Sequence, residues 1–114
     1  MPKAFLSIGS NIDPERHIPA ALKDLTDFFG PLEVSSIYES EAVGFEGPKF
    51  HNLVAAFDSA LSAETVAEHL RAVEERHGRT RASQKFSSRT LDIDLILWGN
   101  EIFTRGRLEI PRPE

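Results

Sequence analysis

The chain has 114 residues, of which 40% are apolar and 27% charged, an ordinary composition for one globular domain. The formal net charge of −5 argues against a general nucleic-acid-binding protein, and no apolar run approaches the length of a membrane span. There is no cysteine, so a metal ion would need oxygen or imidazole ligands. We therefore expect one cytoplasmic domain over 1–114, with no nucleic-acid or membrane partner.

Apolar periodicity and turn residues predict the elements of the first half of the chain. They are a strand over 3–9 that stops at Gly9-Ser10-Asn11, a helix over 14–29, a strand over 34–40 and a loop over 42–48. The helix is predicted from an inward stripe formed by Ile18, Leu22, Leu25 and Phe29. Asp13 is its expected N-cap and Pro14 its first residue.

The second half repeats the pattern of strand, helix and strand. The expected elements are a central strand over 50–59, a helix over 63–77 capped by Ser62, a mobile loop over 79–88, a strand over 90–97 and short extended pieces near 101–103 and 107–110. The order β-α-β-β-α-β predicts an α+β fold of the ferredoxin-like type, an antiparallel sheet with both helices on one face. The other face of the sheet is then free to carry a site.

The segment "RTLDIDLILWG" (89–99) is apolar like a buried strand but contains two acids. A period of two predicts Leu91, Ile93, Leu95 and Leu97 on one face and Asp92, Asp94 and Ile96 on the other. Carboxylates at i and i+2 lie roughly 6.5–7 Å apart. They can converge on magnesium, which prefers oxygen ligands beside phosphates. Taken alone, the pair fits a metal site and a solvated strand face equally well.

Four cations precede this strand without an acid among them: Arg79, Arg81, Lys85 and Arg89. Guanidinium groups pair bidentately with phosphoryl oxygens, so the segment is suited to a triphosphate. Alone it is a solvated basic loop, but its position directly before the two aspartates favours a metal–nucleotide site. The sequence has no G-x-x-x-x-G-K-[ST] motif, so such a site is not a P-loop.

Three further side chains have both a structural and a functional interpretation. Glu74, near the end of the second helix, is by itself a solvent-facing acid. Asn52 lies mid-strand, where its carboxamide either bonds the backbone or reads a polar heterocycle. Phe50 is on the same face and serves as a core aromatic or a stacking surface. The histidines show no convincing metal-ligand spacing and are interpreted as structural or surface residues: His17, His51, His69 and His77.

Taken together, "FLSIGSN", "SSIYESEAVGFEGPKFHNLV", "GRTR" and "SRTLDIDLILWGNE" resemble the 6-hydroxymethyl-7,8-dihydropterin pyrophosphokinase family of the folate pathway. The resemblance runs from about Phe5 to Pro113, and the segment R-T-L-D-[IL]-D-[IL] is its most specific part. It implies a magnesium-dependent enzyme that transfers the β,γ-pyrophosphate of ATP to the pterin hydroxymethyl oxygen and releases AMP. The alternative is a non-catalytic nucleotide- or pterin-binding module on the same scaffold.

The resemblance also implies roles for individual residues. Asp92 and Asp94 would hold two magnesium ions, and Asp92 would also orient the hydroxymethyl group. Phosphate-neutralising catalytic roles are implied for Arg79, Arg81 and Arg89. Nucleotide binding is implied for Glu74, Arg79, Arg89, Leu95, Arg107 and Arg112. Pterin binding is implied for Ser40, Val43, Gly44, Phe50, Asn52 and Asp92.

The sequence departs from the family pattern at several positions. Phe86-Ser87-Ser88 stands where a tryptophan-containing run is common, Ser40-Glu41-Ala42 replaces T-x-P, and Arg112 replaces a histidine. Family members commonly continue past this point, so this chain is expected to be a fragment, a natural short form or a protein that needs a partner. The loops 42–49 and 79–88 are expected to close over ATP and the pterin and exclude water, in a monomer or weak oligomer.

Overall fold

The computed structural model describes residues 1–41, 48–78 and 91–100, together with the backbone of two short strands over 103–105 and 108–110. Its elements are β1 (Lys3–Ser10), α1 (Pro14–Phe29), β2 (Glu33–Val34), β3 (Tyr38–Ser40), β4 (Phe50–Asp58), α2 (Ala63–Arg76), β5 (Asp92–Trp98), β6 (Phe103–Arg105) and β7 (Leu108–Ile110). This order confirms the expected β-α-β-β-α-β arrangement, with the second strand in two pieces and a hairpin of β6 and β7 added.

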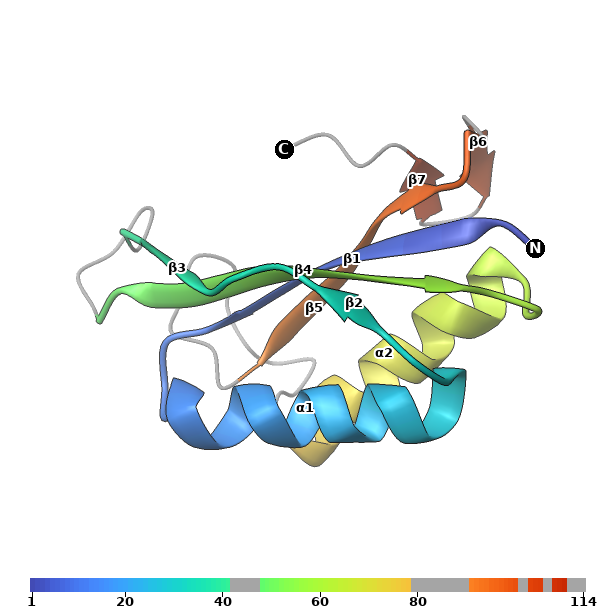
Figure 1. Cartoon of the computed structure of the whole chain (residues 1–114). Helices are drawn as coiled ribbons and strands as arrows, with labels where there is room; N and C mark the ends of the chain where they lie inside the picture. The colour runs from blue at the N-terminus through green and yellow to red at the C-terminus, as the bar shows by residue number, and fades with distance from the viewer. Residues whose placement is uncertain (42–47, 79–90, 101–102, 106–107, 111–114) are drawn as a thin grey trace.

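The main sheet is antiparallel and has the order β2-β4-β1-β5, with β3 also paired to β4. Its centre is therefore β1, which pairs with β4 on one side and β5 on the other. Figure 1 shows α1 and α2 side by side beneath this sheet, so one sheet face is covered by helices and the other is not. Neither helix is long and apolar enough to cross a membrane among the residues described.

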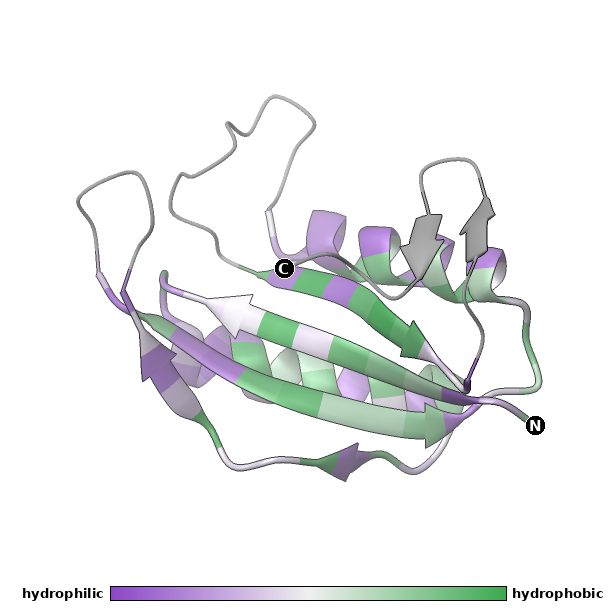
Figure 2. Ribbon diagram, turned by 90° about the horizontal axis from the view of Figure 1, so that it is seen from above, coloured by the Kyte–Doolittle hydropathy of each residue, from purple (hydrophilic) through white to green (hydrophobic). Residues whose placement is uncertain are grey.

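The hydrophobic core fills the layer between the sheet and the helices. Every second residue of β1 is fully buried against it, and α1 and α2 contribute their apolar stripes. These residues are Ala4, Leu6 and Ile8 from β1, Ile18, Ala21 and Leu25 from α1, and Val66, Leu70 and Val73 from α2. The alternation leaves Lys3, Phe5 and Ser7 of β1 for the opposite face, and Figure 2 shows polar positions interrupting the hydrophobic ones along β5. We call this opposite side the open face.

The two helices begin in different ways. Ser62 caps α2 as predicted, because its hydroxyl accepts a hydrogen bond from the Thr65 amide at 3.2 Å. Asp13 precedes α1, but its side chain makes no capping hydrogen bond, and its backbone is left-handed with φ 47°. Its carbonyl instead accepts hydrogen bonds from the amides of Arg16 and His17. Asp13 is therefore the N-cap of α1, as predicted, and it caps the helix through its backbone carbonyl.

The strand expected over 34–40 is interrupted at Ser35. Val34 is opposite Ala55 and Tyr38 is opposite Asn52, so this segment holds one more residue than the part of β4 that it faces. The Ser35 hydroxyl takes the place of a backbone carbonyl and accepts a hydrogen bond from the Val54 amide at 2.9 Å. A serine can terminate a strand in this way because its side chain competes with the backbone for hydrogen bonds.

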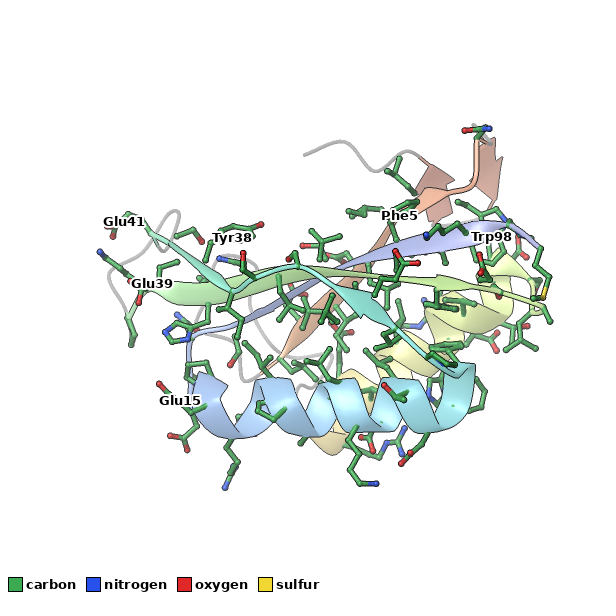
Figure 3. The ribbon with its side chains drawn as sticks, in the orientation of Figure 1. Phe5, Glu15, Tyr38, Glu39, Glu41 and Trp98 are labelled. Atoms are coloured by element: carbon green, nitrogen blue, oxygen red, sulfur yellow. The ribbon has the colours of Figure 1, made fainter. Side chains whose placement is uncertain are left out.

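A bulge near the C-terminal end of β5 makes the predicted alternation of faces wrong for the last two residues of the strand. Phe5 pairs with Leu97 and Leu6 with Leu95, which leaves Ile96 as the extra residue. The faces exchange after it: Leu97, predicted to face inward, is 39% exposed, and Trp98 is only 4% exposed. Figure 3 shows Phe5 on the side of the sheet away from the helices. Asp92 and Asp94 precede the bulge and keep their predicted face.

Two histidines connect the start of α1 to the end of α2. Nδ1 of His17 lies 2.7 Å from Nδ1 of His77, so one ring must donate and the other accept. The pKa of His77 is lowered from its ordinary value by burial and then by the charge of His17, with Arg76 and Arg16 adding to this and Asp24 opposing it. The structural role expected for these histidines fits this contact.

The lowered pKa of His77 predicts a pH dependence of stability. The unfolded chain binds the proton more readily than the folded chain, so the stabilisation is complete above about pH 6.5 and is lost as pH falls toward the folded pKa. We expect the free energy of unfolding in urea to be smaller at about pH 5.5 than at about pH 7.5. His77→Gln should reduce this difference, and an unchanged difference would contradict the assignment to His77. Part of it remains in the variant because burial lowers the pKa of His69 as well.

Candidate active site

A row of paired residues crosses four strands of the sheet. Tyr38 is opposite Asn52, Asn52 is opposite Gly9, and Gly9 is opposite Asp92. Neighbouring strands are about 4.8 Å apart, so Asn52 and Asp92 are separated by roughly 10 Å, with Gly9 between them. The pairing therefore brings the carboxamide and the first aspartate of the sequence analysis onto one face of the sheet, although they are distant in the chain.

Gly9 itself was not expected to be functional. The sequence suggested that it ends the first strand, whereas β1 continues to Ser10 and Gly9 is a paired strand residue. A Cβ on Gly9 would lie 3.1 Å from Oδ1 of Asn52 and 3.7 Å from Cδ1 of Phe50. The Asn52 carboxamide thus occupies the space that a side chain at position 9 would need. A glycine inside a strand is the signal that would have identified this close approach.

The Asn52 side chain is held in a defined orientation. Its Nδ2 donates to the Ser40 hydroxyl at 2.8 Å and to the Phe50 carbonyl at 3.3 Å. With the nitrogen directed to β3, Oδ1 is the atom nearest to Gly9. Ser40, Phe50 and Asn52, three of the predicted pterin-binding residues, therefore lie together at the joined ends of β3 and β4.

The two aspartates are on the open face of β5, next to β1. Asp92 is opposite Gly9 and Asp94 is opposite Ser7, and both are half-buried. The part of the chain that the structure describes holds no group of three or more acids and histidines suited to one metal ion. Two carboxylates on one strand face are oxygen donors of the kind that magnesium takes beside phosphate oxygens and water.

The prediction that Glu74 faces solvent is wrong. Its side chain belongs to the inward stripe of α2 and is 6% exposed, and Oε2 accepts a hydrogen bond from the Ile93 amide at 2.8 Å. Ile93 is the residue between the two aspartates. The spacing of Glu74 four residues after Leu70, in the same stripe, was the available signal.

The remaining predicted site residues fall into two groups. Leu95 is in the core on the opposite face from the aspartates, with 3% exposure, so its side chain is not part of the open face. The others all lie outside the described residues: Val43, Gly44, Arg79, Arg81, Arg89, Arg107 and Arg112. Asn11 is a buried polar residue that was not among the predicted site residues. Its Nδ2 donates a hydrogen bond to the Pro48 carbonyl at 3.1 Å, which links the end of β1 to the segment just before β4.

Comparison with known proteins shows which family the chain belongs to. The family model described as 7,8-dihydro-6-hydroxymethylpterin-pyrophosphokinase (HPPK) matches residues 5–114. The chain belongs to the HPPK family. A 2-amino-4-hydroxy-6-hydroxymethyldihydropteridine pyrophosphokinase of Haemophilus influenzae is 35% identical over 95% of this chain and 69% of its own length. The enzyme of that name from Pseudomonas putida is 30% identical over 96% of this chain and 92% of its own length.

A third HPPK relative, from Aquifex aeolicus, is 31% identical and covers 99% of this chain and 71% of its own length. Membership of the HPPK family rests on nearly the whole chain, including all three strands that form the row from Asn52 to Asp92. The resemblance inferred from the sequence motifs is confirmed.

Proposed function

We propose that the chain transfers pyrophosphate from ATP to 6-hydroxymethyl-7,8-dihydropterin, giving AMP and the pterin diphosphate, with the open face of the sheet as its active site. The observation that carries this proposal is the row formed by Asn52, Gly9 and Asp92. It sets an oriented carboxamide and a pair of carboxylates on one face, in a member of a pyrophosphokinase family.

The donor set at Asp92 and Asp94 fits magnesium, and two ions are proposed with ATP. Both carboxylates are half-buried on the same face, and magnesium bound by one or two carboxylates usually takes phosphate oxygens as further ligands. Magnesium bound there would neutralise charge on the triphosphate. The cations proposed to contact the same phosphates are Arg79, Arg81 and Arg89.

The pterin is proposed to lie along the row, with its ring at Asn52 and its hydroxymethyl arm toward Asp92. Oδ1 of Asn52 accepts a hydrogen bond from the ring, while Ser40 keeps the amide from rotating. Phe50 offers an aromatic surface beside it. In the reaction the hydroxymethyl oxygen bonds to the β-phosphorus, the bond from that phosphorus to the oxygen bridging it to the α-phosphorus breaks, and the hydroxyl proton is released.

The test is incubation of the chain with MgATP and 6-hydroxymethyl-7,8-dihydropterin, followed by measurement of AMP. Formation of AMP that requires both the pterin and magnesium supports the enzyme. Binding of ATP or pterin without AMP would favour the alternative, a binding module, which the substitutions at Phe86 and Arg112 make a reasonable second candidate.

Asn52→Ala should weaken pterin binding selectively. Without the carboxamide, hydrogen-bonding groups of the bound ring are left unpaired, at a cost of about 1–3 kcal/mol. The pterin dissociation constant should therefore rise by one to two orders of magnitude while that of MgATP changes little. Fluorescence titration with the pterin and calorimetry with MgATP would measure both. An equal loss of affinity for both ligands would identify Asn52 as a structural residue.

A further inference from the structure

An acid occupies one position of the apolar stripe that packs α2 on the sheet. Val66, Leu70 and Val73 form this stripe, and Glu74 continues it with 6% exposure. Burying a carboxylate is unfavourable unless hydrogen-bond donors satisfy it. The hydrogen-bond donors that satisfy the buried Glu74 carboxylate therefore indicate its role.

One partner of Glu74 is the backbone of the strand that carries the aspartate pair. Oε2 of Glu74 accepts a hydrogen bond from the Ile93 amide at 2.8 Å. Since β5 is the last strand in the described sheet order, an Ile93 amide that points away from β1 has no further strand to pair with. The Glu74 carboxylate accepts the hydrogen bond that a carbonyl of a neighbouring strand would otherwise accept from Ile93.

The alternation of a strand relates this contact to the aspartates. Consecutive residues of a strand direct their backbone N–H and C=O groups to opposite edges of the strand. Because the Ile93 amide points toward Glu74, the backbone groups of Asp92 and Asp94 point toward their partners on β1, Gly9 and Ser7. The backbone of β5 from Asp92 to Asp94 is thus hydrogen-bonded to β1 on one edge and to Glu74 on the other. Both carboxylates extend from that doubly held segment.

We propose that Glu74 is a positioning residue that fixes the backbone of Ile93 and thereby sets the spacing and direction of the Asp92 and Asp94 carboxylates. The metal part of this inference rests on the proposed function, and the backbone part does not. Glu74 then acts on magnesium through the strand, not as a ligand of the nucleotide. Removal of groups that hydrogen-bond a metal ligand directly typically lowers metal affinity about 10- to 100-fold, so an effect through the adjacent backbone is expected at the lower end of this range.

Three variants of the full chain separate this role from its alternatives. Glu74→Ala removes the acceptor, and Glu74→Gln keeps an oxygen acceptor but removes the charge. Val73→Ala is the matched control, because it truncates the neighbouring, fully buried residue of the same stripe, whose side chain has no atom that could accept a hydrogen bond from Ile93.

The first readout is amide hydrogen exchange at Ile93, measured by NMR without any ligand. Glu74→Ala should accelerate it about tenfold relative to Ile8, its partner on β1. Glu74→Gln should accelerate it less, and Val73→Ala should change both amides equally. This result is independent of whether the chain is a pyrophosphokinase.

The second readout is Mn²⁺ binding, followed by electron paramagnetic resonance in the presence of a non-hydrolysable ATP analogue. Glu74→Ala should raise the Mn²⁺ dissociation constant about tenfold and Glu74→Gln by less. Binding of the same analogue without metal should stay unchanged. If wild-type chain binds Mn²⁺ with the analogue but forms no AMP, the proposed function fails while the inference on Glu74 stands.

Two results would overturn the inference. If Glu74→Ala weakens metal-free binding of the analogue while Ile93 exchange and Mn²⁺ affinity stay at their wild-type values, Glu74 is a nucleotide ligand. If Val73→Ala produces the same change in Mn²⁺ affinity for an equal loss of melting temperature, Glu74 contributes only to packing. Should Glu74→Ala fail to fold, wild-type exchange and Mn²⁺ affinity in Glu74→Gln would also contradict the proposal.

Discussion

Asp94→Asn should abolish most magnesium-dependent AMP formation without unfolding the chain. The amide keeps the size of the side chain but is a far weaker magnesium ligand than an ionised carboxylate. Losing one charge opposite the triphosphate removes about 3–5 kcal/mol of transition-state stabilisation, which lowers turnover by roughly two to four orders of magnitude. Steady-state assays of AMP at saturating MgATP and pterin would measure the loss.

Asp58→Asn is the matched control for this experiment. Asp58 is the exposed last residue of β4, so the same chemical change there should leave turnover near the wild-type value. A titration with magnesium adds a second test, because the activating concentration should rise for Asp94→Asn alone. Wild-type turnover in Asp94→Asn would show that Asp94 belongs to a solvated strand face and not to a metal site.

Gly9→Val should have the second largest effect, a loss of pterin binding by about two orders of magnitude. A Cβ at this position already lies 3.1 Å from Oδ1 of Asn52, and the two methyl groups of valine require more room. The carboxamide would have to leave its place and its hydrogen bond to Ser40. Pterin fluorescence titration would measure the dissociation constant, and calorimetry should show MgATP binding close to that of the wild type.

Gly9→Ala provides a graded comparison. Its single methyl group requires Asn52 to move by only a few tenths of an ångström, so the loss of pterin affinity should lie between those of the wild type and Gly9→Val. Valine is well suited to a strand, so the melting temperature of the valine variant should fall little. Tight pterin binding by Gly9→Val would mean that the Asn52 carboxamide is not part of the pterin site.

The sequence alone predicted burial correctly where a local periodic pattern determines which side chains face the core. The helical stripe of α1 predicted the part of the core that includes Ile18 and Leu25, because the helical period follows from backbone geometry. The acids Asp92 and Asp94 were placed on the open face for the same reason. Their relation to Asn52 was not available from local patterns, since it depends on β4 and β5 both pairing with β1.

The errors have a common physical origin in contacts between distant segments. Nothing local marks Ile96 as the extra residue of a bulge, because the pairing with β1 decides it. Ser35 interrupts its strand only because the amide of Val54 is available to its hydroxyl. The burial of Glu74 was signalled locally by its spacing after Leu70, but its hydrogen bond to Ile93 depends on the packing of α2 against β5.

The central position of β1 has a consequence for how the chain folds during synthesis. β1 is synthesised first, and its second edge stays unpaired until β5, more than 80 residues later in the chain, has been synthesised. Such non-local pairing slows folding, and a strand edge left bare in the meantime is a template for association between chains. A nascent or truncated chain that ends before β5 should therefore aggregate through the edge of β1, the edge beside which Asp92 and Asp94 will later lie.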